Sequence, residues 1–127
     1  YEIRLSLVGS EMCIRDRIGA AATFIRRNGI VECLISTSLP VGVSYKLDME
    51  KSEKDLYNGD FLVMVSDGVL EYLHVPNPEE TMQEIIESIE TNNATILAKR
   101  ILERVLLFTG GKAADDMTVL ATAIWEK

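Results

Sequence analysis

The sequence predicts an α+β fold in which a pair of helices packs on a sheet. A strand candidate of five consecutive apolar residues, 61–65, lies in the middle of the chain. Two amphipathic helix candidates follow between residues 78 and 108, and a last strand candidate covers residues 117–125. Strands followed by helices in this way are typical of α+β domains. The chain has 127 residues, enough for one modest domain.

A hairpin is predicted near the amino end. Residues 18–26 are rich in alanine and other apolar residues, and residues 30–35 are mostly β-branched or apolar. Between them, Asn28 and Gly29 form a strong turn signal, because both residues tolerate a positive φ. We therefore expect two antiparallel strands joined at this turn.

The central strand is expected over residues 61–65. A half-exposed strand over 45–56 and a turn at 58–60 should precede it. Because residues 61–65 are apolar without interruption, we expect this strand to be buried on both faces. It stops at Ser66-Asp67-Gly68, and residues 69–73 fit one helical turn.

The helix pair is predicted from caps and apolar stripes. Asn77 is expected as the N-cap of the first helix, with Pro78 in its first turn and Glu80 at the capping-box position. Residues 91–93 should end this helix and cap the second, which Gly110-Gly111 should end. The stripes comprise Met82, Ile85, Ile86 and Ile89 in the first helix, and Leu97, Ile101, Leu102, Val105 and Leu106 in the second.

Composition excludes several classes of function. The net charge of −7 and the pI near 4.7 argue against a nucleic-acid partner or a polybasic membrane surface. No apolar run approaches the roughly 18 residues of a membrane span. One histidine, His74, nearly excludes a histidine triad or a multi-histidine zinc site. The two cysteines, Cys13 and Cys33, are expected to be thiols in a reducing cytosol.

Three other residues receive structural interpretations. Arg26 and Arg27 are expected to be solvated arginines of the hairpin, in preference to a phosphate site. Trp125 is expected as a core or sheet-edge aromatic residue. His74 is assigned no role.

Residues 1–17 fit poorly with the rest of the chain. The segment YEIRLSLVGSEMCIRDR follows neither the period of a strand nor that of a helix. It also resembles the translation of sequencing-adaptor read-through. We therefore expect a non-native leader over 1–17 and the domain itself over 18–127, with an ordinary N-terminal strand as the alternative.

Two acidic segments adjoin the apolar strands. Asp67 follows residues 61–65, and Asp115 and Asp116 precede residues 117–125. If the two strands are antiparallel neighbours, Asp67 at the end of one lies near Asp115 at the start of the other. Because like charges repel, a hard divalent cation with its preference for oxygen ligands would stabilise such a pair.

A cation held in this way would supply hydrolytic chemistry. It can lower the pKa of a coordinated water and so provide a nucleophile near neutral pH. Each acidic segment alone is more typical of a turn or a solvated loop. Spacing alone therefore leaves a metal site and plain loops as equal alternatives.

Both segments resemble motifs of a known family. Residues 61–69, FLVMVSDGV, resemble the strand-Ser-Asp-Gly motif of the PP2C-type (PPM) metal-dependent protein serine/threonine phosphatases. Residues 114–119, ADDMTV, resemble the last motif of that family. Segments within 18–27 and 38–42 resemble the bacterial branch represented by the phosphatase domain of stage II sporulation protein E. The resemblance extends over residues 18–126.

This resemblance implies a fold and a site. The fold would be a β-sandwich flanked by helices, of which this chain holds the carboxyl-terminal part. Asp67 and Asp115 would ligate one ion of a site for two divalent cations, Mn²⁺ or Mg²⁺. Asp116 would support these ligands from outside the coordination sphere, and no protein residue is assigned as the catalytic nucleophile.

The resemblance also implies a reaction and a partner. Metal-activated water would hydrolyse phosphoserine or phosphothreonine on a protein. In the sporulation branch that protein is a phosphorylated anti-anti-sigma factor, and the parent phosphatase is membrane-anchored with a cytoplasmic catalytic end. We expect a cytoplasmic location, no membrane contact by this fragment, and leave a homodimer open.

One departure from the family pattern has consequences. The upstream metal motifs of the family are not reproduced by Glu2, Glu11 or Asp16. We therefore expect the fragment alone to be inactive and to bind Mn²⁺ weakly. A catalytically silent domain of the same fold, used for binding or regulation, and a plain α+β domain without metal are the alternatives.

Overall fold

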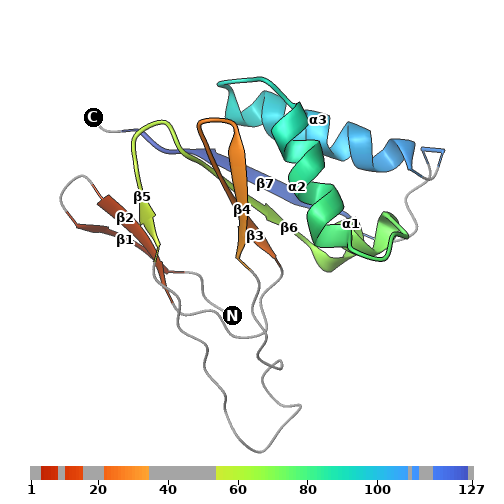
Figure 1. The fold of residues 1–127 in the computed structure, drawn as a ribbon, viewed down its shortest axis with the longest axis horizontal. Coiled ribbons are helices and arrows are strands. Elements are labelled where there is room, and N and C mark those ends of the chain that lie inside the picture. Colours follow the sequence, from red (N-terminus) through yellow and green to blue (C-terminus); the bar gives the residue numbers. More distant parts are fainter. Residues whose placement is uncertain are drawn as a thin grey trace, which may run out of the picture.

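The computed structural model places helices on one side of an antiparallel sheet (Figure 1). It describes residues 4–8, 11–15, 22–34, 54–108, 110–111 and 116–125. The main sheet has four strands in the order β4-β3-β6-β7, all paired antiparallel. Its strands are β3 (Thr23–Arg27), β4 (Ile30–Leu34), β6 (Phe61–Val65) and β7 (Val119–Ala123).

The predicted hairpin and central strand are confirmed. Asn28 and Gly29 join β3 to β4 with φ angles of 51° and 77°. Strand β6 is buried on both faces, because alternate side chains enter two separate cores. Phe61, Val63 and Val65 join the larger core and Leu62 the smaller one. The central strand is therefore rigidly held before it reaches Ser66.

Helices α2 (Pro78–Ser88) and α3 (Ala94–Leu107) lie over one face of the main sheet (Figure 1). Most of the predicted stripes face the larger core, in which the following side chains are buried: Met82, Ile85, Ile86, Ile89, Leu97, Ile101 and Val105. Of the other two predicted members, Leu106 is half-buried against this core, and Leu102 is half-buried outside it. The short helix α1 (Asp67–Tyr72) begins two residues before the predicted turn at 69–73. Asp67 is thereby its first residue.

The helix ends agree with the sequence at two places and disagree at a third. The Asn93 side chain accepts a hydrogen bond from the Ile96 N–H at 3.1 Å, as expected for an N-cap. Gly111, at φ 85°, donates its N–H to the Leu106 carbonyl at 2.9 Å and so closes α3. Asn77 is the N-cap residue of α2 and Pro78 lies in its first turn, as predicted. The capping box itself was wrong, because the Asn77 side chain accepts no backbone N–H and instead donates to Glu80 Oε2 at 3.3 Å.

Helix α2 also covers the outer edge of strand β4. The Gln83 amide donates to the Val31 carbonyl at 3.0 Å, and the Val31 N–H donates to Glu87 Oε1 at 3.2 Å. An edge strand otherwise leaves such backbone groups unpaired within the sheet. These two bonds fix α2 against the sheet.

A second sheet contains β1 (Arg4–Val8), β2 (Glu11–Arg15) and β5 (Asp55–Leu56). Leu56 packs with Ile25, Leu62 and Ile124 in the smaller core, on the face of the main sheet opposite the helices. The two sheets form the β-sandwich that the resemblance to the PP2C-type family implied.

Parts of the predictions lie outside the described residues. Of the strand expected over 45–56, only residues 54–56 are described, and the start of the strand expected at 18–26 falls before residue 22. Residues 4–8 and 11–15 form paired strands, although their sequence shows no strand period. The non-native origin of residues 1–17 stays a prediction. In the part of the chain that is described, no helix is both long and apolar enough to cross a membrane.

Candidate metal centre

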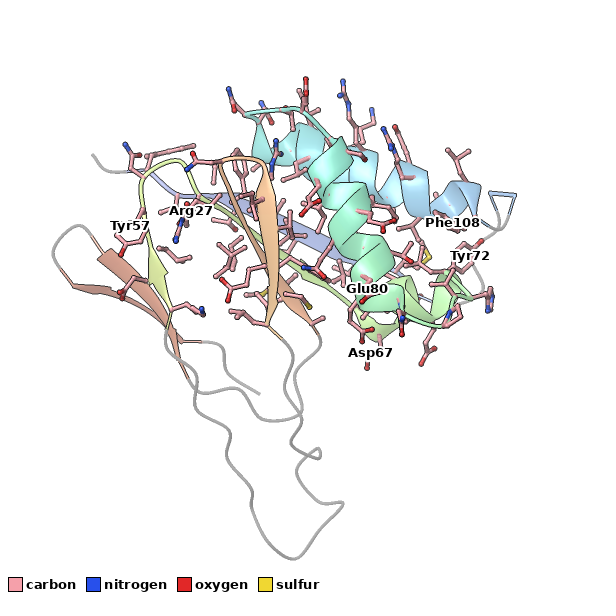
Figure 2. All side chains as sticks on the ribbon, in the orientation of Figure 1. Arg27, Tyr57, Asp67, Tyr72, Glu80 and Phe108 are labelled. Atoms are coloured by element: carbon pink, nitrogen blue, oxygen red, sulfur yellow. The ribbon has the colours of Figure 1, made fainter. Side chains whose placement is uncertain are left out.

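Strand β6 brings Asp67 to the end of the main sheet. Val65 is the last residue of the strand and is buried, Ser66 follows it, and Asp67 opens helix α1. The Asp67 side chain is exposed, and Figure 2 shows it at the margin of the molecule where β6 gives way to α1. The carboxylate is therefore open to solvent on a rigidly held backbone.

Strand β7 runs beside β6 and brings the second acidic segment to the same place. The two strands pair antiparallel with Val65 opposite Val119, as the sequence analysis required. One residue further, the Ser66 N–H donates to the Thr118 carbonyl at 3.0 Å and the Thr118 N–H donates to Ser66 Oγ at 3.0 Å. The residue before Asp67 is thus bonded to a residue just after the second acidic segment.

The predicted ligands are described unequally. Asp115 lies outside the described residues, so its distance from Asp67 stays a prediction. Asp116 is described and exposed, two positions before Thr118. Exposed carboxylates at one end of a strand pair fit a hard divalent cation in chemistry. They do not make a complete set, since the described residues contain no group of three or more His, Cys, Asp or Glu placed to hold a metal ion.

A shallow acidic cleft lies beside Asp67. Its volume is about 280 Å³, and it is lined by Asp67, Leu70, Glu71, His74, Val75, Pro78 and Glu79. Sequence reasoning placed none of the residues after Asp67 at the site, because they meet there only through the packing of α1 on α2. His74, with a φ of 49°, is the member that departs most from ordinary helix or strand backbone.

The hairpin arginines have structural partners, contrary to the prediction that they are simply solvated. Arg27 binds the Asp60 carboxylate through two nitrogens, at 2.9 and 2.6 Å, and its guanidinium lies 4.6 Å from the centre of the Tyr57 ring. The Arg26 guanidinium lies 5.6 Å from the Phe61 ring centre and donates to the Thr91 carbonyl at 3.4 Å. Nothing in the sequence alone identifies these contacts, because they join residues that are distant along the chain and meet only in the folded structure.

Asp60 is the electrostatic centre of this cluster. Its side chain is 2% exposed, and Oδ2 also accepts the Tyr57 N–H at 2.8 Å. Burial opposes ionisation of the carboxyl, but the hydrogen bonds from Arg27 and Tyr57 outweigh it and lower the pKa of Asp60. The same pair raises the pKa of Arg27, chiefly through the hydrogen bond to Asp60. Figure 2 shows Arg27 and Tyr57 well away from Asp67, so this cluster belongs to the opposite end of β6.

Comparison with known proteins identifies the family of the chain. The family model described as stage II sporulation protein E (SpoIIE) matches residues 16–124. Stage II sporulation protein E of Bacillus subtilis is 32% identical over 109 residues, which are 85% of this chain and 13% of that protein. The chain therefore spans a small part of the curated relative that it matches.

Solved structures agree with this result. The SpoIIE phosphatase domain from Bacillus subtilis, presoaked with Mn, matches with a TM-score of 0.81 and 25% identity, over 99% of this chain and 57% of that one. A SpoIIE structure from Bacillus subtilis with the PP2C phosphatase domain and a fragment of the regulatory domain matches with a TM-score of 0.78 and 30% identity. The match covers 87% of this chain and 33% of that one. The mixed fold of the chain is thus that of part of a PP2C phosphatase domain.

Proposed function

Because the chain belongs to the stage II sporulation protein E family, we propose that it is the carboxyl-terminal part of a metal-dependent protein serine/threonine phosphatase domain. The observation that carries the proposal is the junction of the two acidic segments at Ser66 and Thr118. Asp67 follows Ser66 directly, and Asp115 precedes Thr118 by three positions. Three residues of chain reach at most about 10 Å, so both acids start from one small region.

We assign Asp67 and Asp115 as ligands of one of two divalent cations, Mn²⁺ or Mg²⁺. When bound, such a cation would make a water acidic enough to serve as the nucleophile near neutral pH. Asp67 would contribute its charge from a backbone fixed by β6, which limits reorganisation on binding. Asp116, exposed beside this region, would help to orient the ligands.

The substrate proposed is a phosphoserine or phosphothreonine of a protein, and specifically a phosphorylated anti-anti-sigma factor. A protein substrate suits an open site, because Asp67 and Asp116 are both exposed and could meet a residue presented on another surface. We place the reaction in the cytoplasm.

The proposal is tested with the complete phosphatase domain, made by adding the upstream sequence to this chain. Phosphate release from a phosphoserine protein is measured against Mn²⁺ concentration. Asp67→Asn and Asp115→Asn should each lower kcat/KM on the order of 100-fold or more, since even indirect supports of a metal are worth about 10- to 100-fold. Glu71→Gln, in the same cleft but not an assigned ligand, is the matched control and should retain activity.

The outcome also separates the alternatives. A complete domain that binds Mn²⁺ but releases no phosphate would favour a catalytically silent binding module. A domain that neither binds Mn²⁺ nor releases phosphate would refute the metal site altogether.

A further inference from the structure

Ser66 stands at the N-cap position of helix α1, yet its hydroxyl does not cap that helix. A serine at this position ordinarily accepts an N–H from the first turn of its own helix. No such bond is made by the Ser66 side chain. Its Oγ instead accepts the Thr118 N–H at 3.0 Å, from a residue 52 positions away.

The backbone explains why a side chain is needed there. Two residues that form a hydrogen-bonded antiparallel pair exchange both of their N–H···O=C bonds. The Ser66 N–H donates to the Thr118 carbonyl at 3.0 Å, which is half of such a pair. The Ser66 carbonyl is directed to helix α1, where it accepts the Val69 N–H at 3.0 Å. The Ser66 hydroxyl takes the place of that carbonyl and closes the pair.

Ser66 thereby joins two structures at one residue. Its carbonyl starts the helix that Asp67 opens, while its N–H and hydroxyl hold the segment that follows Asp115 and Asp116. With alanine at this position, one of the two bonds across the junction would be lost. The segment before Thr118 could then move relative to Asp67.

We propose that Ser66 is a positioning residue that sets the separation of the two acidic segments and so the affinity for the divalent cation. This inference rests on the proposed function, because it takes Asp67 and Asp115 as ligands. It adds a residue that touches no metal and acts through the backbone of Thr118.

The test compares Ser66→Ala, Ser66→Thr and a control in the complete phosphatase domain. The affinity for Mn²⁺ is measured by isothermal titration calorimetry without substrate, and kcat is measured at saturating Mn²⁺. Ser66→Ala should bind Mn²⁺ about 10-fold more weakly, as for other indirect supports of a metal site. Its kcat at saturating Mn²⁺ should stay within about 3-fold of wild type, because the ligands themselves are intact. Ser66→Thr keeps the hydroxyl and should retain wild-type affinity.

Ser88→Ala is the matched control for loss of a hydroxyl. Ser88 Oγ donates to the Ile85 carbonyl at 2.7 Å and accepts from Arg104 Nη1 at 2.9 Å, so its removal breaks two side-chain bonds, one more than Ser66→Ala breaks. It should lower Tm without changing Mn²⁺ affinity.

Wild-type Mn²⁺ affinity in Ser66→Ala, or an equal loss of affinity in Ser66→Thr, would overturn the positioning role. Asp67→Asn separates this failure from a failure of the proposed function. If Asp67→Asn also binds Mn²⁺ normally, the metal site is wrong. If Ser66→Ala binds Mn²⁺ normally but Asp67→Asn does not, the ligand assignment stands and only the positioning role of Ser66 is refuted.

Discussion

Val65 lies opposite Val119 at the last rung of the pairing between β6 and β7. Beyond this rung β6 passes into α1, and the chain leading into β7 comes from the acidic segment. The antiparallel register therefore brings an acid that follows one strand to the same end of the sheet as acids that precede the other. This pairing is the geometric basis of the predictions on metal binding.

The first prediction concerns the chain alone. The 127-residue chain should release no measurable phosphate from a phosphoserine protein in saturating Mn²⁺, and it should bind Mn²⁺ more weakly than the complete domain. The reason is that Glu2, Glu11 and Asp16 do not reproduce the upstream metal motifs that the family resemblance implies, so Asp67 and Asp115 alone are an incomplete set of ligands. Calorimetry and a phosphate-release assay check this, and turnover by the chain alone would contradict it.

The second prediction concerns the Arg27–Asp60 pair. Asp60→Asn should lower the free energy of unfolding by about 1–2 kcal/mol, because it weakens hydrogen bonds to a buried carboxylate. The loss should stay below that of a fully buried pair, since the Arg27 side chain is 43% exposed and screened by water. Urea denaturation of the complete domain measures it.

A matched control uses an exposed ion pair. Lys54 and Glu32 lie 2.7 Å apart, with 42% and 52% of their side chains exposed. Glu32→Gln should change the unfolding free energy by less than about 0.5 kcal/mol. Equal losses of unfolding free energy in Asp60→Asn and Glu32→Gln would show that burial of Asp60 adds nothing to the stability that its ion pair contributes.

The third prediction is a pH dependence. The pKa of Asp60 is lower in the folded chain than the ordinary value of 3.8. The ionised carboxylate therefore stabilises the fold at pH values above the ordinary pKa. This stabilisation is lost as the pH falls below the ordinary pKa towards the lower pKa of the folded chain. The difference in unfolding free energy between wild type and Asp60→Asn should be constant near pH 6 and shrink below about pH 4. A difference that grows on acidification would contradict this assignment.

The fourth prediction compares two asparagines at helix starts. Asn93→Ala should destabilise the domain by about 1 kcal/mol, because it removes the acceptor of the Ile96 N–H. Asn77→Ala should destabilise the domain by less than about half as much as Asn93→Ala, since the Asn77 side chain accepts no N–H from its helix. Thermal unfolding of both variants tests the difference, and equal losses would restore the capping box expected from the sequence.

Local features of the fold could be predicted from the sequence because their causes are local. The buried strand 61–65 shows as an unbroken apolar run, and the Asn28-Gly29 turn needs only residues that accept a positive φ. The stripes of α2 and α3 follow from the helical period. The position of the N-cap at Asn77 was predicted correctly, but its capping box was not, because a suitable residue type does not determine which partner its side chain binds.

Features built from distant residues could not be predicted in the same way. Asp60 was interpreted as part of a turn, and its pairing with Arg27 joins residues 33 positions apart. The bonds between Ser66 and Thr118 depend on the register of β6 against β7. The placement of Asp67 near the second acidic segment was inferred by assuming that register, which the structure bears out for the strands themselves.

The most direct test is a crystal structure of the complete phosphatase domain soaked with Mn²⁺, with the ions located by anomalous scattering. We predict carboxylate oxygens of Asp67 and Asp115 within about 2.5 Å of the same ion, as expected for oxygen ligands of a hard divalent cation. Contact of the two side chains with different ions, or an orientation of either side chain away from every bound ion, would contradict the assignment of Asp67 and Asp115 as ligands of one cation.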